Sequence, residues 1–511
     1  MKKLSLLIPL FLFVLAFTAR MLPGARTIDD SYITFRYAQN IIAGQGFVYN
    51  PGESVLGTTT PLYTLLMAAL GMVSGGTQAP FPELAMMLNA IADGLTAILL
   101  YLIGKHFKQD LAGIGAALAW SFAPHSVTFA IGGLETSIFV LLLISISYFY
   151  LERRITIAAF LSSLALLTRP DSVLLVGLIA LDHLVRIIRK QEKLRWIDIL
   201  ALGLLPLLWY SFATIQFGSP IPHSVQAKMG AYRLPPEAGF IRLLQHYTTP
   251  FMADKWFGTV FTVGLGLFLY PFFYLIGTRL MTKINPRSLV IMIYPWLYLA
   301  VFAIANPLIF RWYLTPPLPF LFLSILVGVQ AFFSSLLQQP TFHLPKIIQT
   351  GLLILLIIFL PFASLLSNWT MHPDHGLERP APGMAWYQLE LLYQKAAQIV
   401  EPFLTPETTL AAGDVGVLGY FTQARILDTV GLNSPVALQY YPLDEKYYVT
   451  NYAVAPDLIL DQKPELVVLM EVYGRLGLFK DPRFVEQYDL LALIPTDIYG
   501  SEGMLIFIRK E

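Results

Sequence analysis

The chain of 511 residues contains no cysteine and few charged residues. Without cysteine there is no thiolate catalysis, no disulfide bond and no cysteine-ligated metal site. Asp, Glu, Lys and Arg together make up 13% of the sequence, whereas soluble globular domains carry roughly 25%. The formal net charge is +1, so the composition shows no basic field of the kind that nucleic-acid binding requires.

Long apolar runs dominate the rest of the sequence. Hydrophobic residues make up 56% of the chain, and the mean hydropathy is +0.61. A helix needs about 20 mostly apolar residues to cross a bilayer. We therefore predict a mainly α, polytopic helical membrane protein with about eleven transmembrane helices, over residues 3–22, 84–104, 111–128, 135–151, 155–168, 172–186, 196–213, 256–276, 288–306, 316–336 and 348–367. Two of these runs, 155–168 and 172–186, are short enough to form a shallow hairpin instead.

The loops between the spans indicate how the chain is oriented. Short loops rich in lysine and arginine face the cytoplasm, which places the N-terminus inside and residues 23–83 and 368–511 outside the plasma membrane. A cleaved signal peptide over residues 1–19 is an alternative that leaves the loop 23–83 outside as well. The basic residues that fall in alternate short loops are Lys2, Lys3, Lys105, Lys108, Arg153, Arg154, Arg186, Arg189, Lys190, Lys193, Arg195, Arg279, Lys283, Arg287 and Lys346.

The first outer loop, residues 23–83, is predicted to contain two helices of its own. Ser31–Ala43 has a helical pattern, with apolar residues among polar ones. Pro61–Val73 is apolar but too short to cross a bilayer, so we expect both helices to lie along the membrane interface.

The C-terminal part of the chain changes character after residue 367. Charge rises, and short β-rich runs such as Glu465–Met470 and Met504–Ile508 alternate with helical ones. We therefore divide the chain into a transmembrane domain, 1–367, and a small extracytoplasmic α/β domain, 368–511, whose size is ordinary for a domain.

Asp29 and Asp30 are adjacent at the start of the first outer loop. Two carboxylates at a membrane boundary are costly to desolvate and gain little from packing, which favours a chemical role for them. Two structural alternatives stay open. Asp29 is a good N-cap for the helix expected from Ser31, and Asp30 is in a position to pair with Arg36.

Other polar residues of the membrane part collect at the predicted outer ends of the spans: His125, Glu135, Arg169, Asp171, His223, Lys228 and Arg311. This pattern predicts a cavity at the outer leaflet that holds both acids and cations. The alternatives are head-group contact for Arg169, an N-cap for Glu135 and loop packing for the two histidines. The His and Asp residues lack metal-ligand spacing, so we predict no metal or other cofactor. The alternative is a divalent cation bound by Asp29, Asp30 or Glu135.

Several motifs point to one family. In the first outer loop they are Asp29–Asn40, Gly44–Glu53 and Gly57–Leu62, and elsewhere they are Gly133–Thr136, Leu167–Asp171, Pro222–Lys228, Arg311–Pro316, Gly413–Gly416 and Leu427–Leu432. In these motifs, which span nearly the whole chain, the sequence resembles the type C (GT-C) membrane glycosyltransferases. The likeness is greatest to the mycobacterial terminal β-(1→2) arabinofuranosyltransferases and their bacterial relatives.

The resemblance implies a function and its partners. Such enzymes take a sugar from a polyprenyl-phosphate donor and attach it to an acceptor outside the membrane, with an acidic residue of the first outer loop as base. By analogy with the arabinofuranosyltransferases, the sugar expected here is arabinofuranose. The acceptor would be a cell-envelope glycan, lipid or protein. His223 and Thr58–Thr60 depart from the family pattern, which leaves the sugar and the acceptor open.

The chemistry of an inverting displacement assigns provisional roles. We expect Asp29 to take the proton of the acceptor hydroxyl and Asp30 to orient the acceptor, with the reverse assignment still open. Cationic side chains are needed to neutralise the negative charge of the departing phosphate. The remaining predicted site residues are Arg311, Arg169, Lys228 and His223 for the phosphate, and Tyr32, Arg36 and Glu135 for the substrates.

Three other functions are compatible with a polytopic chain. A transporter or flippase for a lipid-linked sugar also carries buried charges, but this chain shows no inverted repeat, and its charges collect on one side of the membrane. A different glycosyl or oligosaccharyl transferase would share the acidic first loop. A non-catalytic assembly protein would use its outer domain to bind polysaccharide.

Overall fold

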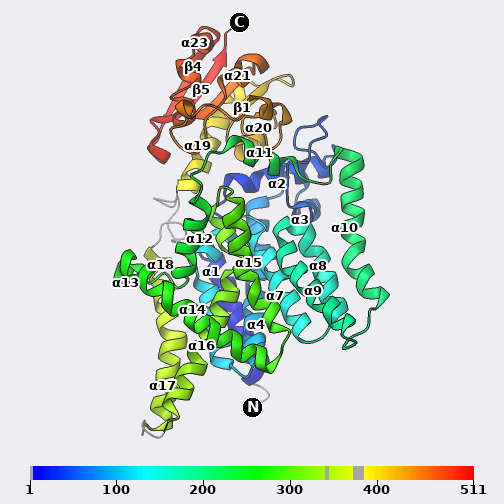
Figure 1. Cartoon of the computed structure of the whole chain (residues 1–511). Coiled ribbons are helices and arrows are strands. Elements are labelled where there is room, and N and C mark those ends of the chain that lie inside the picture. Colours follow the sequence, from blue (N-terminus) through cyan, green and yellow to red (C-terminus); the bar gives the residue numbers. More distant parts are fainter. Residues whose placement is uncertain (1–3, 340–343, 372–384, 511) are drawn as a thin grey trace. The chain divides into compact units, whose positions relative to one another are not determined.

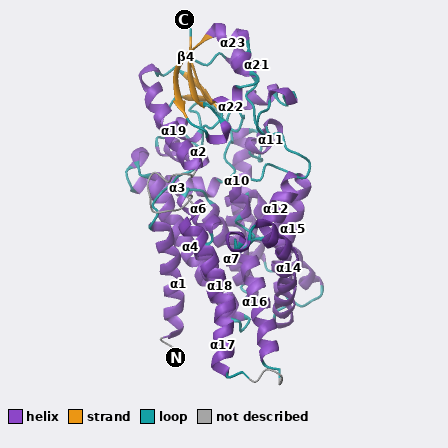
Figure 2. Cartoon of the chain, turned by 90° about the vertical axis from the view of Figure 1, so that its left-hand side faces the viewer, coloured by secondary structure: helices purple, strands orange, loops and turns teal. Residues whose placement is uncertain are grey.

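The protein is mainly helical. Helices account for 69% of the chain, and the strands of the described residues form one sheet near the C-terminus (Figure 2). The computed structural model describes residues 4–339, 344–371 and 385–510. Lys2 and Lys3, which contribute to the predicted orientation, lie outside these ranges.

The chain forms two compact units. The first, which we call the helical unit, comprises residues 1–25, 85–207 and 236–378. The second, which we call the mixed unit, comprises residues 26–84, 208–235 and 379–511, so residues of the first outer loop pack with those of the C-terminal segment. The predicted domain boundary near residue 367 stays a prediction.

Helices that contribute most of their length to the helical unit make up its bulk, and several successive ones are joined by short turns (Figure 1). They are α1 (Leu4–Met21), α4 (Phe81–His106), α5 (Asp110–Phe122), α6 (Pro124–Ile131), α7 (Thr136–Leu151), α8 (Ile155–Thr168), α9 (Val173–Ile188), α10 (Trp196–Phe217), α12 (Ala238–Thr248), α13 (Asp254–Phe257), α14 (Thr259–Ile284), α15 (Ser288–Ala305), α16 (Leu318–Leu337), α17 (Lys346–Ile354) and α18 (Leu360–Met371). Short elements between them are η2 (Pro170–Ser172), η3 (Arg311–Leu314) and η4 (Leu355–Phe359).

Not every predicted span is long enough to cross a membrane. Each predicted span falls on helix. Among the described residues, however, only six helices are long and apolar enough to cross a membrane, or seven if α5 and α6 count as one span bent by 48°. That bend has a simple cause: Ala123 precedes Pro124 and is extended, as residues before proline usually are. The protein is therefore a polytopic helical membrane protein, and the figure of eleven spans stays a prediction.

Glycines let the long helices of the helical unit approach closely. α14 and α16 run side by side (Figure 1). A Cβ on Gly277 would lie 2.0 Å from the carbonyl oxygen of Ser324, and one on Gly328 would lie 1.9 Å from that of Phe273. Small residues at such crossings are typical of membrane helices, where packing rather than hydrophobic burial drives association.

The mixed unit combines helices with a five-stranded sheet. Its longer helices are α2 (Asp29–Ile42), α3 (Pro61–Val73), α11 (His223–Ala231) and α19 (Ala385–Val400), and its shorter ones are η1 (Gly76–Gln78), η7 (Pro435–Tyr440), α20 (Gly416–Thr422), α21 (Pro456–Gln462), α22 (Glu471–Gly474) and α23 (Pro482–Gln487). The strands are β1 (Thr409–Ala412), β2 (Arg425–Asp428), β3 (Leu466–Met470), β4 (Tyr488–Pro495) and β5 (Gly503–Arg509).

The sheet has the order β2-β1-β3-β5-β4. β1 pairs in parallel with β2 and β3, whereas β5 runs antiparallel to β3 and β4. β3 is apolar and buried at every position, as expected for a central strand covered on both faces. Both predicted β-runs, Glu465–Met470 and Met504–Ile508, are thereby confirmed as strands.

Candidate functional site

Asp29 is the first residue of α2, and its carboxylate is held by two backbone amides. The N–H of Gly416 donates to Oδ2 at 2.9 Å, and the N–H of Val417 donates to Oδ1 at 2.8 Å. These donors belong to the start of α20, in the C-terminal segment. The alternative that Asp29 caps its own helix is wrong, because the N-cap position of α2 is Ile28, with no side-chain cap.

Two glycines of α20 make this contact sterically feasible. A Cβ on Gly416 would lie 1.8 Å from the backbone oxygen of Asp29 and 3.0 Å from its Oδ2. A Cβ on Gly419 would lie 2.1 Å from the hydroxyl of Tyr49 and 2.6 Å from Nη1 of Arg36. The Tyr49 hydroxyl also donates to the Val415 carbonyl at 2.6 Å. The start of α20 therefore lies directly against α2 and the first outer loop.

Arg36 joins the first outer loop to the end of α20. Its guanidinium donates to the carbonyl oxygens of Tyr49 (2.7 Å), Gly419 (2.5 Å) and Ala424 (2.7 Å), and to the side-chain oxygen of Asn50 at 3.2 Å. The residue is 1% exposed. The alternative that Arg36 pairs with Asp30 is wrong, and these contacts give Arg36 a structural role. Its predicted part in substrate binding stays a prediction.

Four aspartates of the mixed unit influence one another. Burial raises the pKa of the Asp29 carboxyl well above its usual range, and the negative charges of Asp414 and Asp30 raise it further. Burial also raises the pKa of Asp414 to about 6 and that of Asp428 to about 6. Asp428 accepts the N–H groups of Val430, Gly431 and Asn433, so it shapes the turn after β2. The pKa of Asp29 therefore depends on the charge of Asp414 as well as on burial.

Tyr32 donates its hydroxyl to Oε1 of Glu390 at 2.7 Å. Its ring packs against that of Tyr420, with centroids 5.0 Å apart. Glu390 is 3% exposed, and its Oε2 has no hydrogen-bond partner among the described residues. Burial raises the pKa of Glu390 to about 8, so the side chain is protonated at neutral pH. Tyr32 therefore links α2 to α19, and its predicted role in substrate binding stays a prediction.

His223 and Lys228 lie on α11 of the mixed unit and are both half-buried. The backbone N–H of His223 donates to the Leu56 carbonyl at 2.8 Å, which ties α11 to the first outer loop. Burial lowers the pKa of the His223 imidazole, so it is neutral at pH 7. α11 also packs against η7, next to the turn that Asp428 shapes. The roles predicted for both side chains stay predictions.

Arg169 of the helical unit is bound by two carboxylates. It makes two parallel bonds to Asp171, at 2.9 and 3.0 Å, and a third to Glu135 at 3.3 Å. The rings of Phe139 and Tyr313 flank the guanidinium at 5.0 and 4.9 Å. Because Arg169 is buried and paired, the head-group alternative is wrong. Two acids around one cation also leave the cluster unsuited to attract a further anion.

A second group of cations lies elsewhere in the helical unit. Burial and the neighbouring charge of Arg311 lower the pKa of Arg242 on α12. One turn along α12, His246 packs edge-on against His125 with ring centroids 4.9 Å apart, and burial lowers its pKa to about 4. Arg242 and Arg311 therefore repel each other electrostatically.

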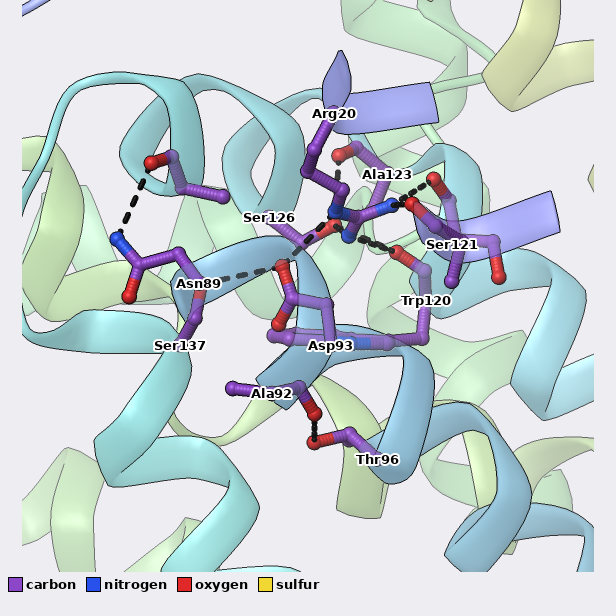
Figure 3. Close-up of polar contacts among 12 residues, drawn as sticks. Arg20, Asn89, Ala92, Asp93, Thr96, Trp120, Ser121, Ala123, Ser126 and Ser137 are labelled. Carbon is purple, nitrogen blue, oxygen red and sulfur yellow. Dashed lines mark hydrogen bonds and ion pairs between the residues drawn. The ribbon is translucent and has the colours of Figure 1, made fainter. Parts of the chain in front are cut away.

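Inside the helical unit a fully buried ion pair connects α1 to α4 (Figure 3). Nε of Arg20 donates to Oδ2 of Asp93 at 2.8 Å, and both side chains are 0% exposed. Arg20 further donates to the Ser121 and Trp120 carbonyls and to Oγ of Ser126. The pair thus connects α1 and α4 to the α5–α6 bend.

The same network holds the N-terminus of α7, which carries Glu135. Oγ of Ser137 donates to Asp93 at 3.0 Å (Figure 3). Asn89 donates to the carbonyls of Ala130 and Leu134 at 3.1 and 2.8 Å. The glutamate that pairs with Arg169 is therefore fixed by polar contacts from α4.

Comparison with known proteins gives a partial sequence match. A family model described as "Domain of unknown function (DUF8728)" matches residues 384–507. The terminal beta-(1->2)-arabinofuranosyltransferase of Mycobacterium tuberculosis is 26% identical over 222 residues, which cover 40% of this chain and 35% of that protein. The chain therefore spans about a third of the length of this curated relative.

Solved structures match over nearly the whole chain. ArnT from Cupriavidus metallidurans bound to undecaprenyl phosphate has a TM-score of 0.57 at 12% identity, over 99% of this chain and 98% of its own. An oligosaccharyltransferase of Archaeoglobus fulgidus, in complex with Zn and sulfate, has a TM-score of 0.53 at 13% identity, over 97% of this chain and 72% of its own. These proteins are GT-C glycosyltransferases.

The chain has a GT-C fold. The resemblance first indicated by the motif Asp29–Asn40 is confirmed. Because the structural match to ArnT covers 99% of the chain, the GT-C likeness includes the C-terminal sheet as well as the apolar helices.

The GT-C chain also contains polar residues that the sequence motifs do not reveal. Glu390 is a buried carboxyl in the C-terminal segment, and Arg242 and Arg20 are cations of the helical unit. Asp414, which is also buried, lies in the motif Gly413–Gly416 but was not predicted as a site residue. Among the described residues no group of three or more His, Cys, Asp or Glu side chains is arranged to hold a metal ion. The predicted absence of a metal stays a prediction.

Proposed function

We propose that this chain is a membrane glycosyltransferase that moves a sugar from polyprenyl phosphate to an acceptor on the extracytoplasmic side of the plasma membrane. The observation that supports the proposal most is an acidic pair at the start of α2, in a fold that matches ArnT with undecaprenyl phosphate over 99% of the chain. Arabinofuranose is the proposed sugar because the curated relative is named for its transfer. A cell-envelope glycan is the proposed acceptor, with an extracytoplasmic lipid or protein as the other classes.

Asp29 is the proposed base. The acceptor oxygen attacks the anomeric carbon, the bond from that carbon to the phosphate oxygen breaks, and the hydroxyl proton passes to Asp29. A raised pKa makes the carboxylate a stronger proton acceptor, and the two amides of α20 fix its position. Each carboxylate oxygen keeps a second lone pair for the proton. Such a base contributes about 10²–10⁴-fold in rate.

Asp30 is the proposed acceptor-binding residue. It is more exposed than Asp29, which is 7% exposed. A half-exposed carboxylate next to the base is well suited to accept a hydrogen bond from a second hydroxyl of the acceptor sugar. The reverse assignment of the two aspartates predicts that Asp30→Asn, and not Asp29→Asn, abolishes transfer.

The donor phosphate is assigned to the cations Arg311 and Arg242 of the helical unit. These arginines repel each other, and a phosphate bound near them would relieve that repulsion. Arg169 is less suited, because Asp171 and Glu135 already neutralise it. Lys228 and His223 of the mixed unit are proposed as further donors to the departing phosphate or sugar.

Donor binding is the first experiment. Purified protein is incubated with undecaprenyl phosphate, alone and carrying arabinofuranose or a hexose, and the thermal unfolding midpoint is recorded. Ligand at 100 times its Kd stabilises the native state by about 2.7 kcal/mol, so a glycosyltransferase of this class shows a midpoint rise. Release of free undecaprenyl phosphate on addition of acceptor identifies transfer. Binding followed by movement of the intact lipid across the bilayer, without release, would identify a flippase instead.

Orientation is the second experiment. Because the chain has no cysteine, single cysteines report unambiguously on the side they face. Lys193→Cys lies in a predicted cytoplasmic loop, and Lys446→Cys lies in the C-terminal segment, where the lysine is exposed. A membrane-impermeant thiol reagent should label only Lys446→Cys in intact cells. The opposite pattern would place the acidic loop inside and contradict the proposal.

A further inference from the structure

Asp414 and Tyr393 form a buried polar pair in the mixed unit that the proposed reaction does not use. The Tyr393 hydroxyl, from α19, donates to Oδ2 of Asp414 at 2.8 Å. Tyr393 is 0% exposed. Asp414 lies two residues before Gly416, so one short segment presents both the amides that hold Asp29 and a second carboxylate. This segment belongs to the C-terminal part of the chain.

The two carboxylates act on each other electrostatically. After burial, the negative charge of Asp414 is the largest influence that raises the pKa of Asp29. The hydrogen bond from Tyr393 works in the opposite direction on Asp414 and lowers its pKa. Other titratable groups that face these two carboxyls from the elements packed around them are Asp30, Tyr49, Tyr232, Asp428 and Tyr473.

We propose that Asp414 and Tyr393 are a positioning pair for the base: Asp414 keeps a second negative charge beside Asp29, and the Tyr393 hydroxyl keeps Asp414 ionised and in place. The inference rests on the proposed function, in which Asp29 accepts the acceptor's proton. A neighbouring anion destabilises the ionised form of Asp29 and so increases its affinity for that proton. The C-terminal domain then supplies part of the catalytic electrostatics of the first outer loop.

The chain offers a matched control for this pair. Tyr440 donates its hydroxyl to Asp461 at 3.0 Å, also within the C-terminal segment. That pair lies at the surface, and neither residue is a hydrogen-bond partner of the Asp29 carboxylate among the described residues. Tyr440→Phe and Asp461→Asn therefore repeat the same chemical changes at a site where the proposal predicts no effect.

The experiment measures proton affinity in the full-length protein by two readouts. Infrared difference spectra of protein labelled with [4-¹³C]aspartate are recorded across a pH titration. The rate of sugar loss from undecaprenyl-phosphate arabinofuranose is recorded over the same pH range. Asp414→Asn should lower the pH of the acid limb of the rate profile by about one pH unit or more, because a like charge near Asp29 has been removed. The plateau rate should fall roughly three- to tenfold, since a weaker base is a poorer catalyst.

Tyr393→Phe provides a second test that does not remove a carboxyl. Without the hydroxyl, Asp414 holds its proton to higher pH, so the acid limb should move in the same direction by a smaller amount. The infrared titration should show one titrating aspartate fewer in Asp414→Asn, and the same number as the parent in Tyr393→Phe. If Asp414→Asn does not yield folded protein, the pH of the acid limb in the rate profile of Tyr393→Phe tests the proposal by itself.

Each outcome separates this inference from the proposed function. An acid limb at the parental pH in Asp414→Asn and Tyr393→Phe would overturn the positioning role, because a purely structural pair changes the rate without moving the limb. Equal shifts in Tyr440→Phe and Asp461→Asn would overturn it too. Transfer by Asp29→Asn within about tenfold of the parent would instead remove the base of the proposed function.

Discussion

Replacing Gly416 with alanine should separate α20 from the start of α2. The added Cβ would lie 1.8 Å from the backbone oxygen of Asp29 and 3.0 Å from its carboxylate. The 1.8 Å contact is with a backbone atom, which cannot turn away as the end of a side chain does, so α20 itself must shift. The shift lengthens the two N–H bonds, from Gly416 and Val417, that hold the Asp29 carboxylate at 2.9 and 2.8 Å.

The size of the effect follows from those two bonds. A hydrogen bond to a charged group contributes about 1.5–3 kcal/mol, so losing both costs about 3–6 kcal/mol of contact energy between α2 and α20. Asp29 also loses the geometry that a base requires, and such a base contributes about 10²–10⁴-fold in rate. We therefore expect Gly416→Ala to transfer sugar at about 1% of the parental rate or less. The thermal unfolding midpoint should fall by several degrees.

The assay compares Gly416→Ala with an alanine substitution at an open position. A Cβ on Gly264, in α14, would meet nothing within 4 Å, and alanine favours helix over glycine by about 1 kcal/mol. Gly264→Ala should therefore keep parental transfer and unfold at the same or a slightly higher temperature. Parental transfer and an unchanged midpoint in Gly416→Ala would refute the claim that α20 holds the base.

Three further predictions concern buried charge. Arg36→Met leaves the carbonyls of its partners unpaired and should lower the free energy of unfolding by about 3–5 kcal/mol in denaturant titration. The control Arg425→Met removes one partner of an exposed ion pair and should change that free energy by about 1 kcal/mol or less. Arg20→Met leaves the carboxylate of Asp93 buried and unpaired, so it should reduce the yield of monodisperse protein on size exclusion, with a cost of about 3–5 kcal/mol. Glu390, with a pKa near 8 when folded and 4.5 as its ordinary value, should destabilise the protein as pH rises from about 4.5 to about 8. Glu390→Gln should remove this pH dependence of stability, which amounts to at most about 5 kcal/mol in unfolding free energy between pH 5 and 9. Parallel curves of unfolding free energy against pH for the parent and the variant would contradict the raised pKa of Glu390.

Local sequence patterns predicted the helices well where a terminating residue was present. α3 spans Pro61–Val73, as predicted, because proline is favoured in the first helical turn and Gly75 and Gly76 follow its end. The break between α5 and α6 was missed, although Pro124 marks it: the apolar run continues across the bend, and hydropathy alone does not register a change in backbone direction.

The contacts of the candidate site were less predictable. Asp29 and its amide donors are 387 and 388 residues apart, and Arg36 and its partner Gly419 are separated by 383. No local pattern records such a pairing. The need for glycine at position 416 is apparent only once the close approach of α20 to Asp29 is known.

The buried ion pair between Arg20 and Asp93 was partly predictable from the sequence, although apolar periodicity alone does not indicate it. Asp93 lies within the predicted span 84–104, where an unpaired carboxylate is expensive, so a cation partner was to be expected. Arg20 lies near the end of the first span, at a position typical of a residue that reaches the interface. Only the arrangement of α1 beside α4 shows that the two meet.

Transfer by Asp29→Asn, with donor binding measured on the same preparation, tests the central claim most directly. The substitution keeps the size of the side chain but removes its ability to accept the proton. We expect a loss of at least about 100-fold in sugar transfer from undecaprenyl-phosphate arabinofuranose, with donor-induced thermal stabilisation unchanged. Turnover within about tenfold of the parent, with donor bound, would contradict it.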